Sequence, residues 1–441
     1  MKTKLGRYIV PSVLATVGTS CYTLADTFFI SLAEGANGIT ALNLVLPIYG
    51  LIFAIGAMIG IGSATCYSLK KSRGETDADA FFINSIVFTA VIGVILMTVG
   101  LVFARQILSV LGADDTIMAV GLDYLKTFLI FTPFFMLNYT FTAFIRNDGA
   151  PNIAMAATII SGVFNIVFDY VFMFPMGLGM FGAALATGVS PVVSMLICLT
   201  HYLSKKNNVR LVRVKPSFRR LFSACSLGVS AFVGEITMSV TTLVFNFLLL
   251  AIGGNTAVAA YGVIANLAVV AIALFNGVSQ GLQPMASALH GQGDAAGEKS
   301  VLVKSAAVAL VIAAVLLAVT LIFARQIVAI FNTEGSEQLF NYAVPGIKLY
   351  FTGFPLAAVN VVFAGFYAAT GRGRASSLIS VTRGIIAIIL CAFIMSELLG
   401  ITGVWLSFPA AEVITLVITL VLLRKTASVK SKENEKQVNK E

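Results

Sequence analysis

Residues 164–172 read Phe-Asn-Ile-Val-Phe-Asp-Tyr-Val-Phe, an apolar run that carries one amide and one carboxylate. Asn165 and Asp169 are four residues apart, so a helix places both side chains on one face, one turn from each other. Another carboxylate, Asp26, lies within the first apolar run of the chain. Carboxylates are rare in apolar membrane helices, and where they occur they mark functional sites.

The amino-acid composition indicates which class of protein carries these carboxylates. The chain has 441 residues, of which 58% are hydrophobic and only 11% charged, whereas soluble domains are about 25% charged. The apolar runs are continuous over about 20 residues and do not alternate, which favours membrane helices over a β-barrel. The net charge of +9 is explained by basic loops that set membrane topology, so we expect a lipid bilayer and no nucleic acid as partner.

The apolar runs predict an all-α polytopic membrane protein with twelve transmembrane helices. Loops with many Lys and Arg residues then fall on one side if the N-terminus is cytoplasmic, and Arg383 is counted among these loop residues. We therefore expect a multi-pass protein of the plasma membrane with both termini in the cytoplasm. The predicted spans are residues 8–32, 40–68, 81–103, 120–145, 152–174, 180–203, 222–251, 256–289, 300–323, 341–369, 376–398 and 402–424.

The two halves of the chain repeat each other. Phe-Ala-Arg-Gln-Ile occurs at residues 103–107 and again at 323–327, and Leu-Gly-x-x-Gly-x-x-Leu occurs at 178–185 and again at 399–406. Six helices per repeat predict two bundles related by a pseudo-twofold axis along the membrane normal, with a cleft between them. The predicted domains are a first lobe (1–203), a basic cytoplasmic linker (204–221), a second lobe (222–424) and a disordered tail (425–441).

Small residues and one proline predict features of the helix packing. Gly56 and Gly60 recur as Gly277 and Gly281, and such pairs let membrane helices approach closely. Pro11 removes a backbone donor early in the first helix. It is either a tolerated membrane proline or a bend point that acts with the acidic site further along that helix.

The buried acids need a compensating partner. An unpaired charge at mid-bilayer costs about 2.5–3.5 kcal/mol on insertion scales, and we expect no Lys or Arg at the apolar centre of any span. One acid stays protonated, a cation binds, or water reaches the site. Asn165 and Thr187 can add oxygen ligands, which suit a proton or a hard cation such as Na⁺ rather than zinc or copper. The alternative is a hydrogen-bonded cluster with a structural role only.

The second half lacks this acid pair, because the repeat places Leu390 opposite Asp169. It has two intramembrane acids of its own. Glu235 is a candidate for substrate contact or coupling, with a structural role as the alternative, and Glu412 is interpreted as structural. The chain has no G-x-x-x-x-G-K-[ST], H-E-x-x-H or C-x-x-C motif, so we expect neither an enzyme nor a cofactor.

Over nearly its whole length the chain resembles the multidrug and toxic compound extrusion (MATE) transporters. The likeness rests on Asp-Thr at residues 26–27, on Asn-x-x-x-Asp at 165–169, and on the short loops at 73–77 and 291–294. The resemblance implies two six-helix lobes in a V shape and a bend of the first helix at Pro11. The chain departs from the family pattern in one place, since we find no carboxylate in the tenth helix.

The resemblance also implies site residues. The first-lobe cation site would comprise Asp26, Asn165, Asp169 and Thr187, and the family's acid in the seventh helix matches Glu235.

These observations predict a secondary active antiporter. It would export organic cations or amphipathic drugs, and so confer antibiotic resistance, in exchange for H⁺ or Na⁺ as the coupling ion. We expect a monomer whose small-molecule partners are drug-like substrates, with that ion as the coupling ion. The alternatives are a flippase for lipids or lipid-linked oligosaccharides and a membrane scaffold or receptor that transports nothing.

Overall fold

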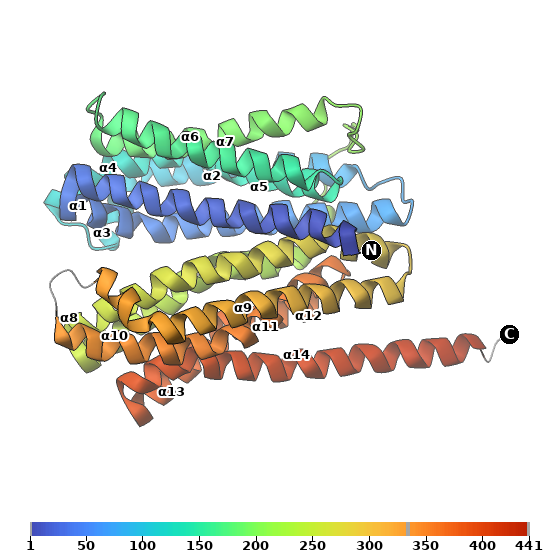
Figure 1. Ribbon diagram of the computed structural model, residues 1–441. Helices are drawn as coiled ribbons and strands as arrows, with labels where there is room; N and C mark the ends of the chain where they lie inside the picture. Colours follow the sequence, from blue (N-terminus) through green and yellow to red (C-terminus); the bar gives the residue numbers. More distant parts are fainter. Residues whose placement is uncertain (1, 332–335, 439–441) are drawn as a thin grey trace.

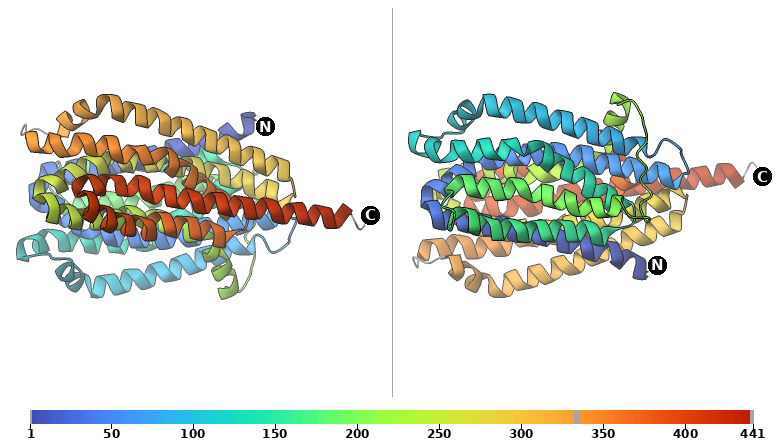
Figure 2. Two further views of the ribbon diagram at one scale, coloured as in Figure 1. Left: turned by 90° about the horizontal axis from the view of Figure 1, so that it is seen from below. Right: turned by 90° about the horizontal axis from the view of Figure 1, so that it is seen from above.

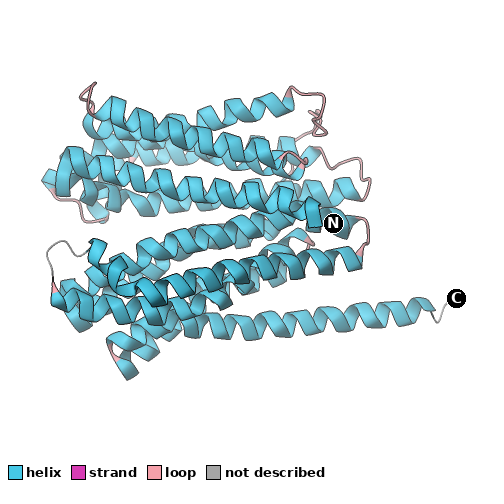
Figure 3. Cartoon of the chain, viewed as in Figure 1, coloured by secondary structure: helices cyan, strands magenta, loops and turns pink. Residues whose placement is uncertain are grey.

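The computed structural model describes residues 2–331 and 336–438. Figure 3 shows helices joined by loops and turns over this part of the chain, as a bilayer requires, because backbone polar groups must there be satisfied within each segment. In chain order the elements are α1 (Lys2–Ser72), α2 (Ala80–Val102), α3 (Ala104–Val110), α4 (Asp115–Ile130), α5 (Thr132–Asn147), α6 (Pro151–Met173), α7 (Gly179–Tyr202), α8 (Phe218–Gly291), α9 (Ala295–Phe331), α10 (Glu337–Tyr350), the 3₁₀ turn η1 (Phe351–Gly353), α11 (Phe354–Ala369), α12 (Gly373–Val381), the π-helical turn η2 (Thr382–Ile386), α13 (Ala387–Leu399) and α14 (Ile401–Val438).

The described helices account for twelve membrane crossings. Ten helical stretches are long and apolar enough to cross a bilayer, with the two arms of α1 counted separately and α8 counted once, and α4 and α5 form a further span bent by 46°. The 74 residues of α8 exceed one crossing, and its backbone breaks at Gly254 (φ 64°). A similar break divides α1 at Gly35 (φ 59°). Both breaks use glycine because a positive φ is strained for residues that have a Cβ.

The helices form two bundles. Figure 1 shows α1–α7 in one layer and α8–α14 in the other. Figure 2 looks along the stack, with α8–α14 nearer the viewer from below and α1–α7 nearer from above. The largest hydrophobic core belongs almost entirely to the second bundle, but it includes Leu5 and Ile9 from the start of α1. The first turns of α1 therefore pack against the opposite bundle.

The bundles meet closely at the end that carries the N-terminus. A Cβ on Gly281 of α8 would lie 2.6 Å from the Cα of Ile9 in α1, and one on Gly228 would lie 1.9 Å from the carbonyl oxygen of Met58. Contacts this short require glycine, since any side chain would push the helices apart. This end of the interface is therefore closed.

The repeated glycine pairs have different partners in the two halves. Gly277 and Gly281 face α1 across the interface, whereas Gly56 and Gly60 pack against α5 within the first bundle. Equivalent sequence positions thus serve contact between the bundles in one half and packing inside a bundle in the other.

The last helix extends well past the membrane. α14 continues to Val438 and projects from the bundle in Figure 1. The backbone of residues 425–438 is therefore helical where we predicted disorder, and the many Lys, Glu and Gln residues there have high helix propensity. The final residues of that predicted tail, 439–441, lie outside the described part of the chain.

Candidate functional site

The first candidate site lies inside the first bundle. The amide nitrogen Nδ2 of Asn165 in α6 donates to Oδ1 of Asp169 at 3.4 Å and to Oγ1 of Thr187 in α7 at 3.1 Å. Asn165 and Asp169 are fully buried and Thr187 is nearly so. The helical spacing predicted that Asn165 and Asp169 share a face, and the amide then joins that face to α7.

Asp26 of α1 completes this cluster from a third helix. Its side chain is buried, and α1 runs beside α6 at this level, where the ring of Phe29 lies 6.2 Å from that of Tyr170, the residue after Asp169. The structure thus brings together all four residues that the sequence analysis selected. Three helices far apart in sequence contribute to the cluster, so a movement of α1 changes its geometry directly.

Three oxygen atoms of the cluster are buried without a hydrogen-bond partner: Oδ1 of Asp26, Oδ2 of Asp169 and Oδ1 of Asn165. None of the salt bridges among the described residues reaches either carboxylate. Buried acceptors are almost always satisfied in folded proteins, because an unmade hydrogen bond costs about 1–3 kcal/mol.

The donor set fits a hard cation or a proton, because all the available ligand atoms are oxygens. Among the described residues, no group of three His, Cys, Asp or Glu side chains is placed to hold a metal ion. The cluster therefore does not have the ligands that zinc or copper requires.

Pro11 lies apart from this cluster. The backbone of α1 stays helical through Pro11, and the helical rise separates it from Asp26 by about 22 Å along the axis. Its neighbours Ile9 and Val13 contact Gly281 and Gly277 of α8. Pro11 therefore sits at the crossing of the two bundles, where a bend of α1 would change the contact between them.

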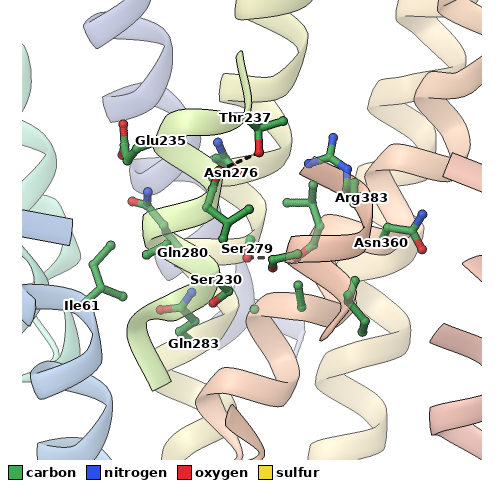
Figure 4. A pocket seen from close by; sticks show the side chains of 18 residues that line it. Ile61, Ser230, Glu235, Thr237, Asn276, Ser279, Gln280, Gln283, Asn360 and Arg383 are labelled. Carbon is green, nitrogen blue, oxygen red and sulfur yellow. Dashed lines mark hydrogen bonds between the residues drawn. The ribbon is translucent and has the colours of Figure 1, made fainter. Parts of the chain in front are cut away.

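The second candidate site is a cavity in the second bundle. The space within it, including the part open to solvent, is about 670 Å³, and both arms of α8 line it together with α11, α12, η2 and Ile61 of α1. Figure 4 shows amide, hydroxyl and charged side chains around it. The long polar side chains are Glu235, Asn276, Gln280, Gln283, Asn360 and Arg383.

Two hydrogen bonds connect this cavity to the first bundle. Tyr139 of α5 donates from its hydroxyl to Oε1 of Glu235 at 3.1 Å. Arg146 of α5 donates from Nη1 to Oε1 of Gln280 at 2.7 Å. Glu235 therefore lies at the boundary between the bundles, where an occupant of the cavity would affect the contact between them.

The expectation that Arg383 lies in a loop, and that no cation lies at the centre of a span, is wrong. Arg383 lies in η2, between α12 and α13, and its Nε donates to Oε1 of Glu412 at 2.5 Å. Asn360 donates to Oε2 of the same carboxylate at 2.9 Å, and Thr419 donates to Asn360. A guanidinium is tolerated inside the membrane here because the buried Glu412 neutralises it.

Sequence reasoning missed most of this cavity, although signals existed. Asn276, Gln280 and Gln283 recur at helical spacing within an apolar span, which places three amides on one face. The predicted spans 376–398 and 402–424 already contained Arg383 and Glu412. Pairing the two would have predicted a buried ion pair between neighbouring helices.

Comparisons with known proteins give the family. The family model MatE matches residues 11–171 and again residues 231–393, once in each bundle. A multidrug export protein MepA of Staphylococcus saprophyticus is 30% identical over 410 residues, which cover 92% of this chain and 90% of that protein. The MepA of Staphylococcus aureus strain MRSA252 is 28% identical over 433 residues, or 97% of this chain and 95% of that protein.

A solved structure gives the fold independently. The chain is similar to a multidrug resistance MATE family transporter of the MOP superfamily in an outward-facing conformation. The TM-score is 0.90 at 20% identity, with coverage of 97% of this chain and 96% of that chain. The predicted all-α polytopic membrane fold is thereby confirmed. The chain belongs to the MatE family, the multidrug and toxic compound extrusion transporters, and is a transporter rather than an enzyme.

Proposed function

We propose that this chain is a secondary multidrug antiporter that exports organic cations and amphipathic drugs in exchange for Na⁺ or H⁺. Family membership and the multidrug export proteins among its relatives support the drug substrates. The observation that carries the antiport proposal is the first-bundle cluster, in which Asp26, Asp169 and Asn165 each bury an unpartnered oxygen.

The coupling cation would act by changing the balance between two arrangements of α1. Without a cation, Asp26 and Asp169 repel each other, and a bound Na⁺ or proton removes that repulsion and favours the arrangement that brings the carboxylates together. A ligand shifts a conformational equilibrium only by its difference in affinity for the two states. Each unit charge that enters down a potential of 100 mV supplies about 2.3 kcal/mol.

The substrate would bind in the cavity of the second bundle. Glu235 offers one carboxylate to an organic cation, and the amides of Asn276, Gln280 and Gln283 offer hydrogen bonds to polar atoms of a drug. Displacing Tyr139 from Glu235 would break a hydrogen bond between the bundles. Substrate binding and the separation of the bundles are thereby connected through one residue.

The two bundles would move as lobes. We propose a first lobe of residues 1–203 and a second of 222–424, joined by the linker 204–221, in a monomer of the plasma membrane with both termini cytoplasmic. In that orientation the end closed by Gly228 and Gly281 would face the cytoplasm, as expected for an outward-facing state.

A flippase for lipids or lipid-linked oligosaccharides is the second candidate, favoured by the presence of Arg383 in the cavity wall. Its guanidinium is neutralised by Glu412, so the charged side chain left in the lining is that of Glu235, which does not suit an anionic headgroup.

The test is flux of a fluorescent organic cation in proteoliposomes, with a Na⁺ gradient and a pH gradient imposed separately. Flux under one gradient, abolished by Asp169→Asn, supports the proposal and identifies the coupling ion. If vesicles containing folded protein show no flux under either gradient, the antiporter proposal fails. Movement of a labelled lipid in the same vesicles would then identify a flippase, and its absence would favour a scaffold or receptor.

A further inference from the structure

The segment that joins the two bundles carries a dense and one-sided charge. We call residues 203–222 the basic segment, and it contains no Asp or Glu. Figure 1 shows this segment at the same end of the molecule as the N-terminus. Its seven basic residues are Lys205, Lys206, Arg210, Arg213, Lys215, Arg219 and Arg220.

The acids of the first bundle hold this segment by its backbone and not by its basic side chains. The backbone N–H of Asn208 donates to Oδ2 of Asp148 at 2.9 Å, and that of Arg210 donates to Oδ1 of Asp79 at 3.1 Å. The backbone N–H of Ser217 donates to another side chain of the first bundle at 2.7 Å. The segment is fixed in place while its ammonium and guanidinium groups stay available.

A neighbouring loop at the same end shows the opposite arrangement. Lys70 pairs with Glu75 at 2.5 Å and with Asp77 at 2.8 Å, and Lys71 pairs with Asp79 at 3.2 Å. Within residues 2–331 and 336–438, no ion pair includes a cation of the basic segment. Among the described residues, positive charge is therefore held in ion pairs beside the α1–α2 loop and left without ion pairs in the segment between the bundles.

Large apolar side chains are exposed among these cations. The exposed fractions are 86% for Leu203, 80% for Leu211, 67% for Phe218 and 70% for Phe222. Leu203 directly follows α7 and Phe218 begins α8, so these side chains lie where two membrane helices end. Exposed apolar groups mixed with cations at this depth are typical of segments that lie in a membrane interface.

We propose that the basic segment binds the phosphate headgroups of anionic phospholipids. The cations contact the phosphates, and Leu203, Leu211, Phe218 and Phe222 insert between the acyl chains. A free inorganic phosphate would leave those apolar groups in water, so the lipid is the better occupant. Because the segment connects the bundles, a bound lipid holds the connection at the membrane surface while the bundles move.

The test measures lipid binding directly and does not depend on transport. Purified full-length protein in neutral detergent is titrated with fluorescent phosphatidylglycerol in the presence of excess phosphatidylcholine. The test variant combines Arg210→Gln, Arg213→Gln, Lys215→Gln and Arg219→Gln, which keeps every backbone donor. The control removes the same charge at the opposite end through Arg105→Gln, Lys126→Gln, Arg325→Gln and Lys348→Gln, all exposed positions.

We expect the wild type and the control to prefer phosphatidylglycerol equally, and the test variant to bind it at least about tenfold more weakly, because each basic residue near an anionic surface adds to the attraction. Equal affinity of the test variant, or an equal loss in the control, would overturn the proposal. Competition by millimolar inorganic phosphate would instead indicate a free-anion site.

A second variant covers the case in which the test variant fails to fold. Leu203→Ser with Leu211→Ser keeps all charges and should lower the affinity for phosphatidylglycerol several-fold through the apolar contacts alone. Unchanged affinity in this folded variant would contradict insertion of the segment among the acyl chains.

Discussion

The two bundles both bury carboxylates inside the membrane, but they balance the negative charge differently. In the second bundle, Glu412 receives a guanidinium from Arg383 and an amide from Asn360, so its partners are part of the protein. In the first bundle, Asp26 and Asp169 have no cation and keep one unpartnered oxygen each. The acid of the second bundle is therefore neutralised permanently by the protein, which suits a structural role. The acids of the first bundle can be neutralised by an ion that binds and leaves, which suits transport.

The largest predicted effect follows from removing Arg383, the cation that neutralises Glu412. Arg383→Gln leaves Glu412 buried without its partner, and losing one member of a buried pair costs about 3–5 kcal/mol. We expect a marked loss of thermal stability for the purified protein in detergent. The double variant with Glu412→Gln should recover much of that loss, because no charge then remains unpaired. A double variant no more stable than Arg383→Gln would mean that the pair does not balance the charge.

The converse change in the first bundle should affect transport and leave the fold intact. Asp169→Asn removes a charge that has no cationic partner among the described residues, so we expect normal membrane insertion and thermal stability at or above that of the wild type. Gradient-driven flux should fall at least about a hundredfold, which corresponds to about 2.7 kcal/mol. Glu412→Gln is the matched contrast, since it removes an acid of similar burial but leaves Arg383 without its partner and should lower the thermal stability. If Asp169→Asn transported at the wild-type rate, the first-bundle cluster would not be the coupling site.

A cation that binds between Asp26 and Asp169 should also stabilise the folded protein. If Na⁺ is the coupling ion, Na⁺ at about 100 times its dissociation constant should stabilise the folded protein by about 2.7 kcal/mol. The measurement is the unfolding temperature in NaCl compared with that in choline chloride at equal ionic strength. The shift should disappear in Asp26→Asn and persist in Glu235→Gln. A shift of the same size in Asp26→Asn would locate Na⁺ elsewhere.

The smallest predicted effect concerns the contact between the bundles. Tyr139→Phe removes the hydroxyl that donates to Glu235, and one such hydrogen bond contributes about 0.5–1.5 kcal/mol. We expect a shift of several-fold in the populations of the two lobe arrangements, measured as the distance distribution between spin labels on the two bundles. Thr142→Val is the control, because its hydroxyl bonds only within its own helix. If both variants shifted the distance distribution equally, the hydroxyl of Tyr139 would have no specific role in the contact between the bundles.

The fold was predictable because a bilayer permits few solutions. Long apolar runs must be helical there, and repeated sequence patterns predicted two similar halves. The helical spacing alone put Asn165 and Asp169 on one face, while the addition of Thr187 and Asp26 from other helices rested on depth and on the family resemblance.

Other features depended on how helices rotate and pack. Arg383 and Glu412 both lie within predicted spans, but pairing them requires the relative rotation of two helices, which residue spacing along each helix does not give. The glycine pairs at 56 and 60 and at 277 and 281 look equivalent in sequence, yet only the latter pair contacts the other bundle. The amide face of Asn276, Gln280 and Gln283 was visible as spacing, but its role emerged only from the cavity that it lines.

The most direct test of the central claim is ion binding to the purified protein. Equilibrium binding of radioactive Na⁺ and proton release at fixed pH should be measured for the wild type, Asp169→Asn and the control Glu235→Gln. The account predicts that one stoichiometric ion site, for Na⁺ or for a proton, is present in the wild type and Glu235→Gln and absent in Asp169→Asn. Unchanged Na⁺ and proton stoichiometry in Asp169→Asn would contradict it.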